Sequence, residues 1–275
     1  MRERFRRLGL ISRILLGLTA ALVVLAIIGP YIAPHDPIAL GSAPLERPSW
    51  AHPFGTDQVG RDVFSRVLAG ARASFAIAVS VVLIAVTVGT AIGLVAGLSA
   101  RVADESLMRL TDMFFAFPYL ILAMAVVASL GPGDKSLIVA LSLIWWPSYA
   151  RQVRGHVLAL RSASFVDASL IVGNSRVRTA RRHILPQMYP ELGVRMTLDF
   201  GNVILIASAL GFLGLGARPP SPEWGSILFE AKSYTLQAWW MSIFPGVVLA
   251  MSVLLFSLLG DSLQTRPRFL RRATI

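Results

Sequence analysis

The 275-residue sequence has no cysteine and few charged residues. Without cysteine, the chain can form no disulfide bond, zinc–thiolate site or cysteine nucleophile. Only 15% of its residues are charged, whereas an ordinary soluble domain has about 25%. Apolar residues make up 55% of the chain, and the mean hydropathy is +0.65. This composition excludes a disordered chain and a disulfide-rich secreted module, and it indicates a membrane protein.

Motifs for nucleotide hydrolysis and metal binding are also missing. The string nearest to a Walker A motif, GPGDKS at 131–136, has Asp134 where the second glycine belongs. The string G-x-S-x-G does not occur. The histidines show neither H-x3-H nor H-E-x-x-H spacing; they are His35, His52, His156 and His183. We therefore expect no catalytic residue, no metal ligand and no cofactor bound by this chain.

Long apolar runs dominate what is present. A helix needs roughly 20 apolar residues to cross a bilayer core about 30 Å thick. The shortest candidate, 136–150, can extend toward Arg151, whose side chain can reach the lipid headgroups. The candidate 196–216 contains one charged residue, Asp199. The sequence predicts an all-α integral membrane protein with six transmembrane helices, at 14–32, 75–98, 113–130, 136–150, 196–216 and 241–260.

Two features inside these spans predict local geometry. Pro118, Pro147 and Pro245 each remove a helical hydrogen bond, so we expect kinks there. The string GFLGLG at 211–216 brings small residues together and favours close helix packing.

The N-terminal string MRERFRRLGLISR, followed by an apolar run, has features of a signal peptide as well as of a first span. The apolar run is longer than the usual signal-peptide core, and a small-x-small cleavage site does not follow it. We therefore expect 1–13 to be a basic cytoplasmic N-terminus and 14–32 to be an uncleaved span.

Basic residues are concentrated on one side of the predicted spans. The segments 1–13, 99–112, 151–195 and 261–275 hold 19 lysines and arginines, whereas 33–74, 131–135 and 217–240 hold 7. The positive-inside rule places the first set, and hence both termini, in the cytoplasm. Membrane topology then explains the basic balance, and no nucleic-acid partner is expected.

The first predicted extracytoplasmic loop, 33–74, contains the string HPFGTDQVGRDVFSRVLAGARAS. Thr56 or Asp57 can cap a helix here by accepting hydrogen bonds from free backbone N–H groups. We expect this helix to run along the membrane surface and to lead into the second span. Capping and a local ion pair are the simplest interpretation of Asp57, Arg61 and Asp62.

The predicted cytoplasmic loop 151–195 carries a helical pattern. Ser164 and Asp167 have the spacing of a capping box. Gly173 interrupts the pattern, so we expect two short helices with a bend there, and an end to the second helix at Pro186. Such an element can lie on lipid, pack on the other loops or dock into a partner protein. Its apolar stripe comprises Val166, Leu170, Gly173, Val177, Ala180 and Ile184.

The same loop resembles the EAA loop of bacterial ABC importer permeases, in which E-A-A-x3-G is followed ten residues later by I-L-P. Asp167 and Ser169 stand where that family has Glu and Ala. The matching residues are Asp167, Ala168, Ser169, Gly173, Ile184, Leu185 and Pro186.

Further strings extend the resemblance from about Leu10 to Asp261. The segment HPFGTDQVGRDVFSRVLAGARAS is similar to the loop after the first span in the second permease of dipeptide, oligopeptide and nickel importers. The remaining strings are FLGLG at 212–216, PPSPEWG at 219–225, FPG at 244–246 and GD at 260–261.

The resemblance implies a type I importer permease fold in the bacterial inner membrane. In that family a homologous second permease completes the pore, two ATPase subunits bind ATP and Mg, and an extracytoplasmic solute-binding protein delivers the cargo. The cargo implied is dipeptides or short oligopeptides, with nickel or a metal chelate as the alternative. A stand-alone secondary transporter or channel is the rival class of protein.

The resemblance also assigns two sets of residues. In the EAA-like loop, Asp167, Ala168, Ser169 and Gly173 are expected to contact an ATPase subunit, and Ile184, Leu185 and Pro186 to return the chain to the fifth span. The extracytoplasmic family motif comprises Gly55, Thr56, Asp57, Gly60, Arg61 and Asp62.

Overall fold

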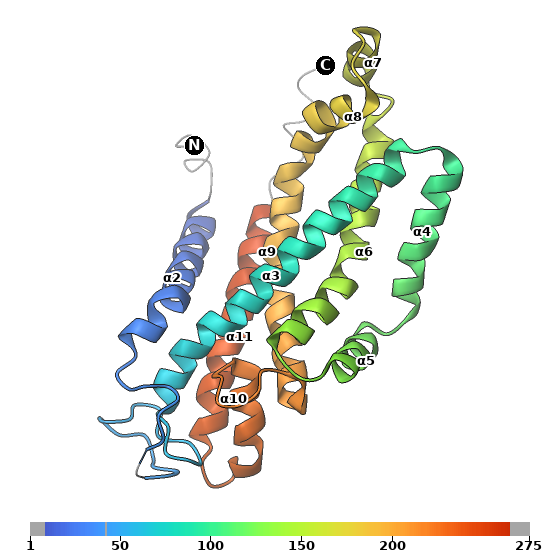
Figure 1. The fold of residues 1–275 in the computed structure, drawn as a ribbon. Helices are drawn as coiled ribbons and strands as arrows, with labels where there is room; N and C mark the ends of the chain where they lie inside the picture. The colour runs from blue at the N-terminus through green and yellow to red at the C-terminus, as the bar shows by residue number, and fades with distance from the viewer. Residues whose placement is uncertain (1–8, 42, 265–275) are drawn as a thin grey trace. The chain divides into compact units, whose positions relative to one another are not determined.

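The computed structural model describes residues 9–41 and 43–264 (Figure 1). Within these two ranges every regular element is a helix, apart from one isolated antiparallel bridge between Thr56 and Asp62. Most of the expected basic N-terminus 1–13 and of the expected cytoplasmic tail 261–275 lies outside the described residues. The chain forms two compact units, which we call the terminal unit (residues up to Ala78 and from Thr197 on) and the central unit (Val79–Met196).

Most of the long helices contain an apolar run of the sequence, but they begin and end at residues that differ from the bounds predicted for the spans. In chain order they are α2 (Leu10–Ile32), α3 (Val63–Leu98), α4 (Arg101–Ala116), α5 (Tyr119–Leu130), α6 (Asp134–Leu160), α7 (Ser164–Ile171), α8 (Arg176–Thr179), the π-helix η1 (Ala180–Ile184), α9 (Leu185–Leu210), the π-helix η2 (Gly211–Leu215), α10 (Trp224–Ala231), the 3-10 helix η3 (Lys232–Tyr234) and α11 (Trp240–Gln264).

Several of these helices are long and apolar enough to cross a membrane. In the described part of the chain they are α2, α3, the continuous run Arg176–Leu215 and α11. The pair α4 and α5 also qualifies if it counts as one span bent by 89° at Pro118. The expected span 136–150 lies inside α6, whose later turns carry Arg151 and Arg154. The total of six spans stays a prediction.

Three local predictions about helix ends were wrong. Asp62, rather than Thr56 or Asp57, caps α3: its Oδ2 accepts from the backbone N–H of Ser65 at 2.8 Å. The residues expected to form a surface helix and the second span make one unbroken helix, Val63–Leu98. Asp57 is not available as that cap because it binds the N–H groups of the preceding turn, at Val59 and Arg61.

The other two corrections concern the loop predicted to be cytoplasmic. Among the described residues, none provides a side-chain cap for α7, so Ser164 and Asp167 form no capping box. Pro186 does not end a helix, because α9 begins at Leu185 and continues through it. The run from α8 to α9 is continuous past this proline, and the π-helical turn η1 lies directly before it.

In the central unit, glycines of α3 let α6 approach closely. A Cβ atom on Gly89 would lie 2.5 Å from the Cβ of Tyr149, and one on Gly97 would lie 2.7 Å from the Cβ of Val157. Gly93, midway between them, meets Val153 in the same way. The spacing G-x3-G-x3-G therefore forms one smooth helix face, which is a typical membrane packing surface.

In the terminal unit, α2 packs along α11, and α10 is held against η2. Close packing at GFLGLG is confirmed, because a Cβ on Gly211 would lie 2.9 Å from the Cα of Gly225. Glu223 is buried there: its carboxylate caps α10 by accepting from the N–H groups of Gly225 and Ser226, both at 2.9 Å. These bonds fix the start of α10.

Candidate functional site

In the loop predicted to be cytoplasmic, a bend at Gly173 joins the short helix α7 to the start of the continuous run Arg176–Leu215. The φ angle of this glycine is +92°, a value that residues with side chains rarely adopt. Its N–H donates to the carbonyl of Leu170 at 2.9 Å, and the N–H of Asn174 donates to the carbonyl of Ser169 at 3.1 Å. Beyond the bend, the Ser175 hydroxyl caps α8 through the N–H of Arg178. The predicted bend at Gly173 is therefore confirmed, but the predicted second short helix is not, because α8 continues without a break through η1 into α9.

A buried pair of hydroxyl groups braces α7 against α8. The Ser169 and Thr179 hydroxyl oxygens are 3.0 Å apart, and the Asn174 side-chain amide donates to Ser169 at 3.2 Å. Both hydroxyl residues are buried. Ser169, expected from the resemblance to contact a partner, points into the loop and sets its shape.

The predicted apolar stripe divides between the inside and the outside of the loop. Val166, Ala180 and Ile184 are buried in the core of the central unit. Leu170 and Val177 are exposed instead, as are Ile171 and Val172, which the stripe omitted and which are 85% and 82% exposed. We call Leu170, Ile171, Val172 and Val177 the apolar patch.

A signal for this patch was present in the sequence. Each residue of a helix is rotated by about 100° from the one before it, so the side chains of three successive residues spread over about 200° of the helix surface. A run such as Leu-Ile-Val therefore cannot bury every member on one narrow face. The run Leu170–Val172 ends directly before the bend at Gly173. It therefore lies where α7 ends and the loop is open to its surroundings.

The remaining residues of the EAA-like set divide into exposed residues and residues that are partly or fully buried. Asp167 and Ala168 are exposed on α7 beside the apolar patch, and Pro186 is exposed at the start of α9. Leu185 is half-buried, and Ile184 is buried beneath the loop. Asp167, Ala168 and Gly173 are therefore available to another molecule, whereas Ser169 and Ile184 support the loop from within.

Exposed arginines lie on the loop, and an ion pair joins the two helices α4 and α6 of the same unit. Arg176, Arg178, Arg181 and Arg182 are exposed. In the same unit, two hydrogen bonds from the Arg154 guanidinium to Asp104, at 2.5 and 2.7 Å, tie α6 to α4. These bonds lower the pKa of the Asp104 carboxyl and raise the pKa of Arg154, so both groups stay ionised at neutral pH.

Figure 1 shows α7 and α8 at one end of the central unit and α5 at the other. A cavity of about 330 Å³ lies behind α7, and its lining includes Leu98, Arg161 and Val166. The outer surface of the loop combines the apolar patch with exposed arginines, and the Ser169–Thr179 contact holds the loop in shape. Such a face suits docking to another protein.

The motif predicted to be extracytoplasmic forms a second, buried polar cluster in the terminal unit. The Arg61 Nε donates to Asp57 Oδ2 at 2.6 Å, which confirms the predicted local ion pair. Arg61 also pairs with Glu230, and Arg66 reaches the same carboxylate at 3.1 Å. Sequence reasoning missed Arg66 and Glu230 because Glu230 lies more than 160 positions further along the chain.

The other motif residues shape the turn that leads into α3. The Thr56 hydroxyl donates to the carbonyl of Ala43 at 2.9 Å and accepts from the N–H of Glu46 at 2.8 Å. Gly55 and Gly60 have φ angles of +71° and +82°. Asp62 then caps α3. The six motif residues thus build one structured loop, which the Arg61–Glu230 pair ties to α10.

Comparison with known proteins identifies the family of the chain. Residues 89–268 match the family described as "Binding-protein-dependent transport system inner membrane component". This match covers more than half of the chain.

Individual relatives are similar over most of their length. The chain is 40% identical over 244 residues to the "Probable D,D-dipeptide transport system permease protein DdpC" of Escherichia coli K12, covering 88% of this chain and 82% of that one. It is 40% identical over 250 residues to the "Di/tripeptide transport system permease protein DppC" of Pseudomonas aeruginosa, with the same coverage. It is 42% identical over 219 residues to the "Glutathione transport system permease protein GsiD" of Pectobacterium atrosepticum, covering 80% and 73%.

Solved structures share the fold. A chain of the MetNI methionine ABC transporter in an inward-facing conformation superposes with a TM-score of 0.60 at 18% identity, covering 74% of this chain and 97% of that one. A chain of an amino acid ABC transporter superposes with a TM-score of 0.55 at 15% identity, covering 74% and 94%.

Proposed function

Because the chain belongs to the family of binding-protein-dependent transport system inner membrane components, we propose that it is the permease subunit of an ABC importer for dipeptides or short oligopeptides. The relatives described above are named for dipeptide, tripeptide and glutathione transport. Those names favour peptide cargo over nickel or a metal chelate. Membership of a binding-protein-dependent family also argues against a stand-alone secondary transporter or channel.

The partners proposed are those of the importer class. A homologous second permease completes the pore, two ATPase subunits hydrolyse ATP with Mg, and an extracytoplasmic binding protein delivers the peptide. The chain itself then supplies the pathway through the inner membrane and does not catalyse a reaction. With both termini in the cytoplasm, the loop that carries α7 and α8 faces the ATPase subunits.

One observation carries the coupling role most strongly. Ile171 and Val172 are more than four-fifths exposed at the end of α7, outside every predicted span. Large apolar side chains gathered on a braced loop are characteristic of protein docking sites. The Ser169–Thr179 contact stiffens this loop, so a push from a bound ATPase would pass into η1 and α9.

The test replaces the exposed apolar residues by charge. We expect Ile171→Asp and Val172→Asp to weaken co-purification of the ATPase subunits with the permease and to abolish most ATP-driven uptake of a labelled dipeptide. A buried carboxylate at an interface lacks its hydration and finds no partner there, which weakens binding. Val102→Asp is the matched control, because Val102 is 77% exposed in α4 and lies outside the loop.

Permease abundance in the membrane is measured in the same strains. The proposal requires abundance close to wild type in all three variants, with loss of ATPase association only in the two loop variants. Full uptake by Ile171→Asp and Val172→Asp would refute docking at the apolar patch. ATP-independent uptake by the chain alone would refute the importer assignment itself.

A further inference from the structure

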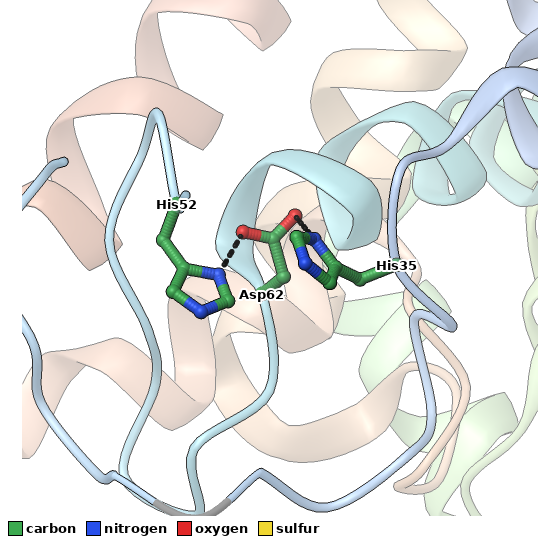
Figure 2. A group of neighbouring side chains, drawn as sticks. All are labelled: His35, His52 and Asp62. Carbon is green, nitrogen blue, oxygen red and sulfur yellow. Dashed lines mark hydrogen bonds and ion pairs between the residues drawn. The ribbon is translucent and has the colours of Figure 1, made fainter. Parts of the chain in front are cut away.

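Three metal-ligating side chains meet on the loop between α2 and α3. Figure 2 shows His52 and His35 approaching the Asp62 carboxylate from two sides. The Nδ1 atom of His52 lies 2.9 Å from Asp62 Oδ1, and the Nδ1 atom of His35 lies 3.7 Å from Asp62 Oδ2. One ligand atom from each residue falls within 4.8 Å of those of the other two.

The fold brings these residues together from separate places in the loop. His35 follows the end of α2 at Ile32, and its N–H donates to the Ser65 hydroxyl at 3.1 Å. The N–H of His52 donates to the Ser49 hydroxyl at 3.1 Å. The two imidazole rings lie with their centroids 4.7 Å apart. Backbone anchors therefore hold both rings beside the start of α3.

We propose that His35, His52 and Asp62 bind a divalent transition-metal ion, with Zn²⁺ as the best-matched ion. Two imidazole nitrogens and one carboxylate oxygen are a ligand set that suits Zn²⁺ better than Ca²⁺ or Mg²⁺, which prefer oxygen alone. In a tetrahedral site with bonds of about 2.0–2.1 Å, ligand atoms lie roughly 3.3 Å apart. The three ligand atoms already lie within 4.8 Å of one another, so each pair has to approach by at most about 1.5 Å to reach that spacing.

The Asp62 carboxylate is held in place by bonds that leave one oxygen for the metal. Its Oδ2 accepts from the Ser65 N–H at 2.8 Å and from the Ser65 hydroxyl at 2.6 Å. Its Oδ1 faces His52. The side chain is 1% exposed. Hydrogen bonds that orient a ligand in this way raise metal affinity, because the carboxylate loses little freedom on binding.

The space next to these residues suits the remaining coordination position. A cavity of about 230 Å³ is lined by all three residues and also by Asp36 and Glu46. It has room for a water molecule as a further ligand. The two additional carboxyl groups make the cavity acidic, which favours entry of a cation.

A bound ion would join three parts of the loop that are otherwise linked by backbone turns and hydrogen bonds. It would connect the end of α2 through His35, the middle of the loop through His52 and the first turn of α3 through Asp62. The result would be a more rigid extracytoplasmic loop. The site shares no residue with the apolar patch, and it does not depend on which cargo the protein carries.

The experiment uses the full chain, purified in detergent with an affinity tag that contains no histidine. Zn²⁺ binding is measured by calorimetric titration and by the metal content retained after desalting. We expect about one Zn²⁺ per chain in the wild type and at least roughly tenfold weaker binding in His35→Ala and His52→Ala. His183→Ala is the matched control, because His183 is exposed in η1 of the cytoplasmic loop, and it should bind as the wild type does.

A third variant separates metal binding from helix capping. Asn caps helices about as well as Asp but is a poor zinc ligand. Asp62→Asn should therefore keep the helix content and the monodisperse profile of the wild type while losing Zn²⁺ affinity. Co²⁺ in place of Zn²⁺ should give the intense visible absorption of a tetrahedral site, and His52→Ala should remove it. Absence of Zn²⁺ binding in the wild type, or equal binding in a folded His35→Ala/His52→Ala double variant, would overturn the proposal.

Discussion

Gly93 of α3 lies directly against Val153 of α6. A Cβ atom on Gly93 would come within 2.8 Å of the Val153 Cβ and within 2.5 Å of the Ala150 carbonyl oxygen. Real Cβ atoms do not make contacts this short, so the two helix backbones are closer than any other residue at position 93 would allow. Gly89 and Gly97 extend the same contact by one helical turn in each direction.

A single methyl group at this position should therefore destabilise the central unit. We expect Gly93→Ala to lower the free energy of unfolding by about 1–3 kcal/mol, because backbone atoms of α6 must move away. The measurement is the thermal unfolding temperature in detergent, together with the amount of protein in the membrane. Gly17→Ala is the control, since none of the described residues has an atom within 4 Å of a Cβ built on Gly17. An unchanged unfolding temperature in Gly93→Ala would contradict the close approach.

The bend at Gly173 allows backbone strain to be separated from contact with a partner. None of the described residues has an atom within 4 Å of a Cβ built on Gly173, so a side chain there meets no steric clash with them and is opposed by the φ of +92°. Gly173→Ala and Gly173→Leu should both pay a penalty of roughly 1–2 kcal/mol for that backbone conformation. If the bend enters a groove on the ATPase, Gly173→Leu should lose much more uptake and ATPase association than Gly173→Ala. Equal losses in the two variants at equal permease abundance would argue that Gly173 only bends the chain.

The predicted topology can be tested because the chain has no cysteine. A cysteine at Leu236, which is fully exposed, should react with a membrane-impermeant maleimide in spheroplasts. A cysteine at Ser162, exposed between α6 and α7, should react only after permeabilisation. The reason is the excess of basic residues in the segments assigned to the cytoplasm. Labelling of Ser162→Cys without permeabilisation would require a different number of spans.

Short-range features of the fold followed from the sequence. The break at Pro118 was predictable because a proline both removes a hydrogen bond and restricts the residue before it, and α4 and α5 are bent there by 89°. The bend at Gly173 was predictable because glycine alone adopts positive φ readily. Each of these rules acts within a few residues, so no knowledge of the packing was needed.

The cap of α3 shows where such rules stop. Thr56, Asp57 and Asp62 all carry an oxygen that can cap a helix, and they lie within seven positions of one another. The turn at Gly60 and the bridge between Thr56 and Asp62 place only Asp62 at the first turn of α3. Spacing along the chain could not make that choice.

By itself, the sequence determined the class of this protein. Its apolar runs and one-sided basic charge indicate a membrane protein, and its ordered strings indicate the permease family, because both kinds of signal are carried by residues close together in the chain. Only the tertiary structure decided which distant polar groups share a site: Glu230 with Arg61 and Arg66, and His35 with His52 and Asp62. Those contacts join residues that are far apart in the chain. Local backbone preferences act over a few residues, so they cannot specify which distant side chains meet.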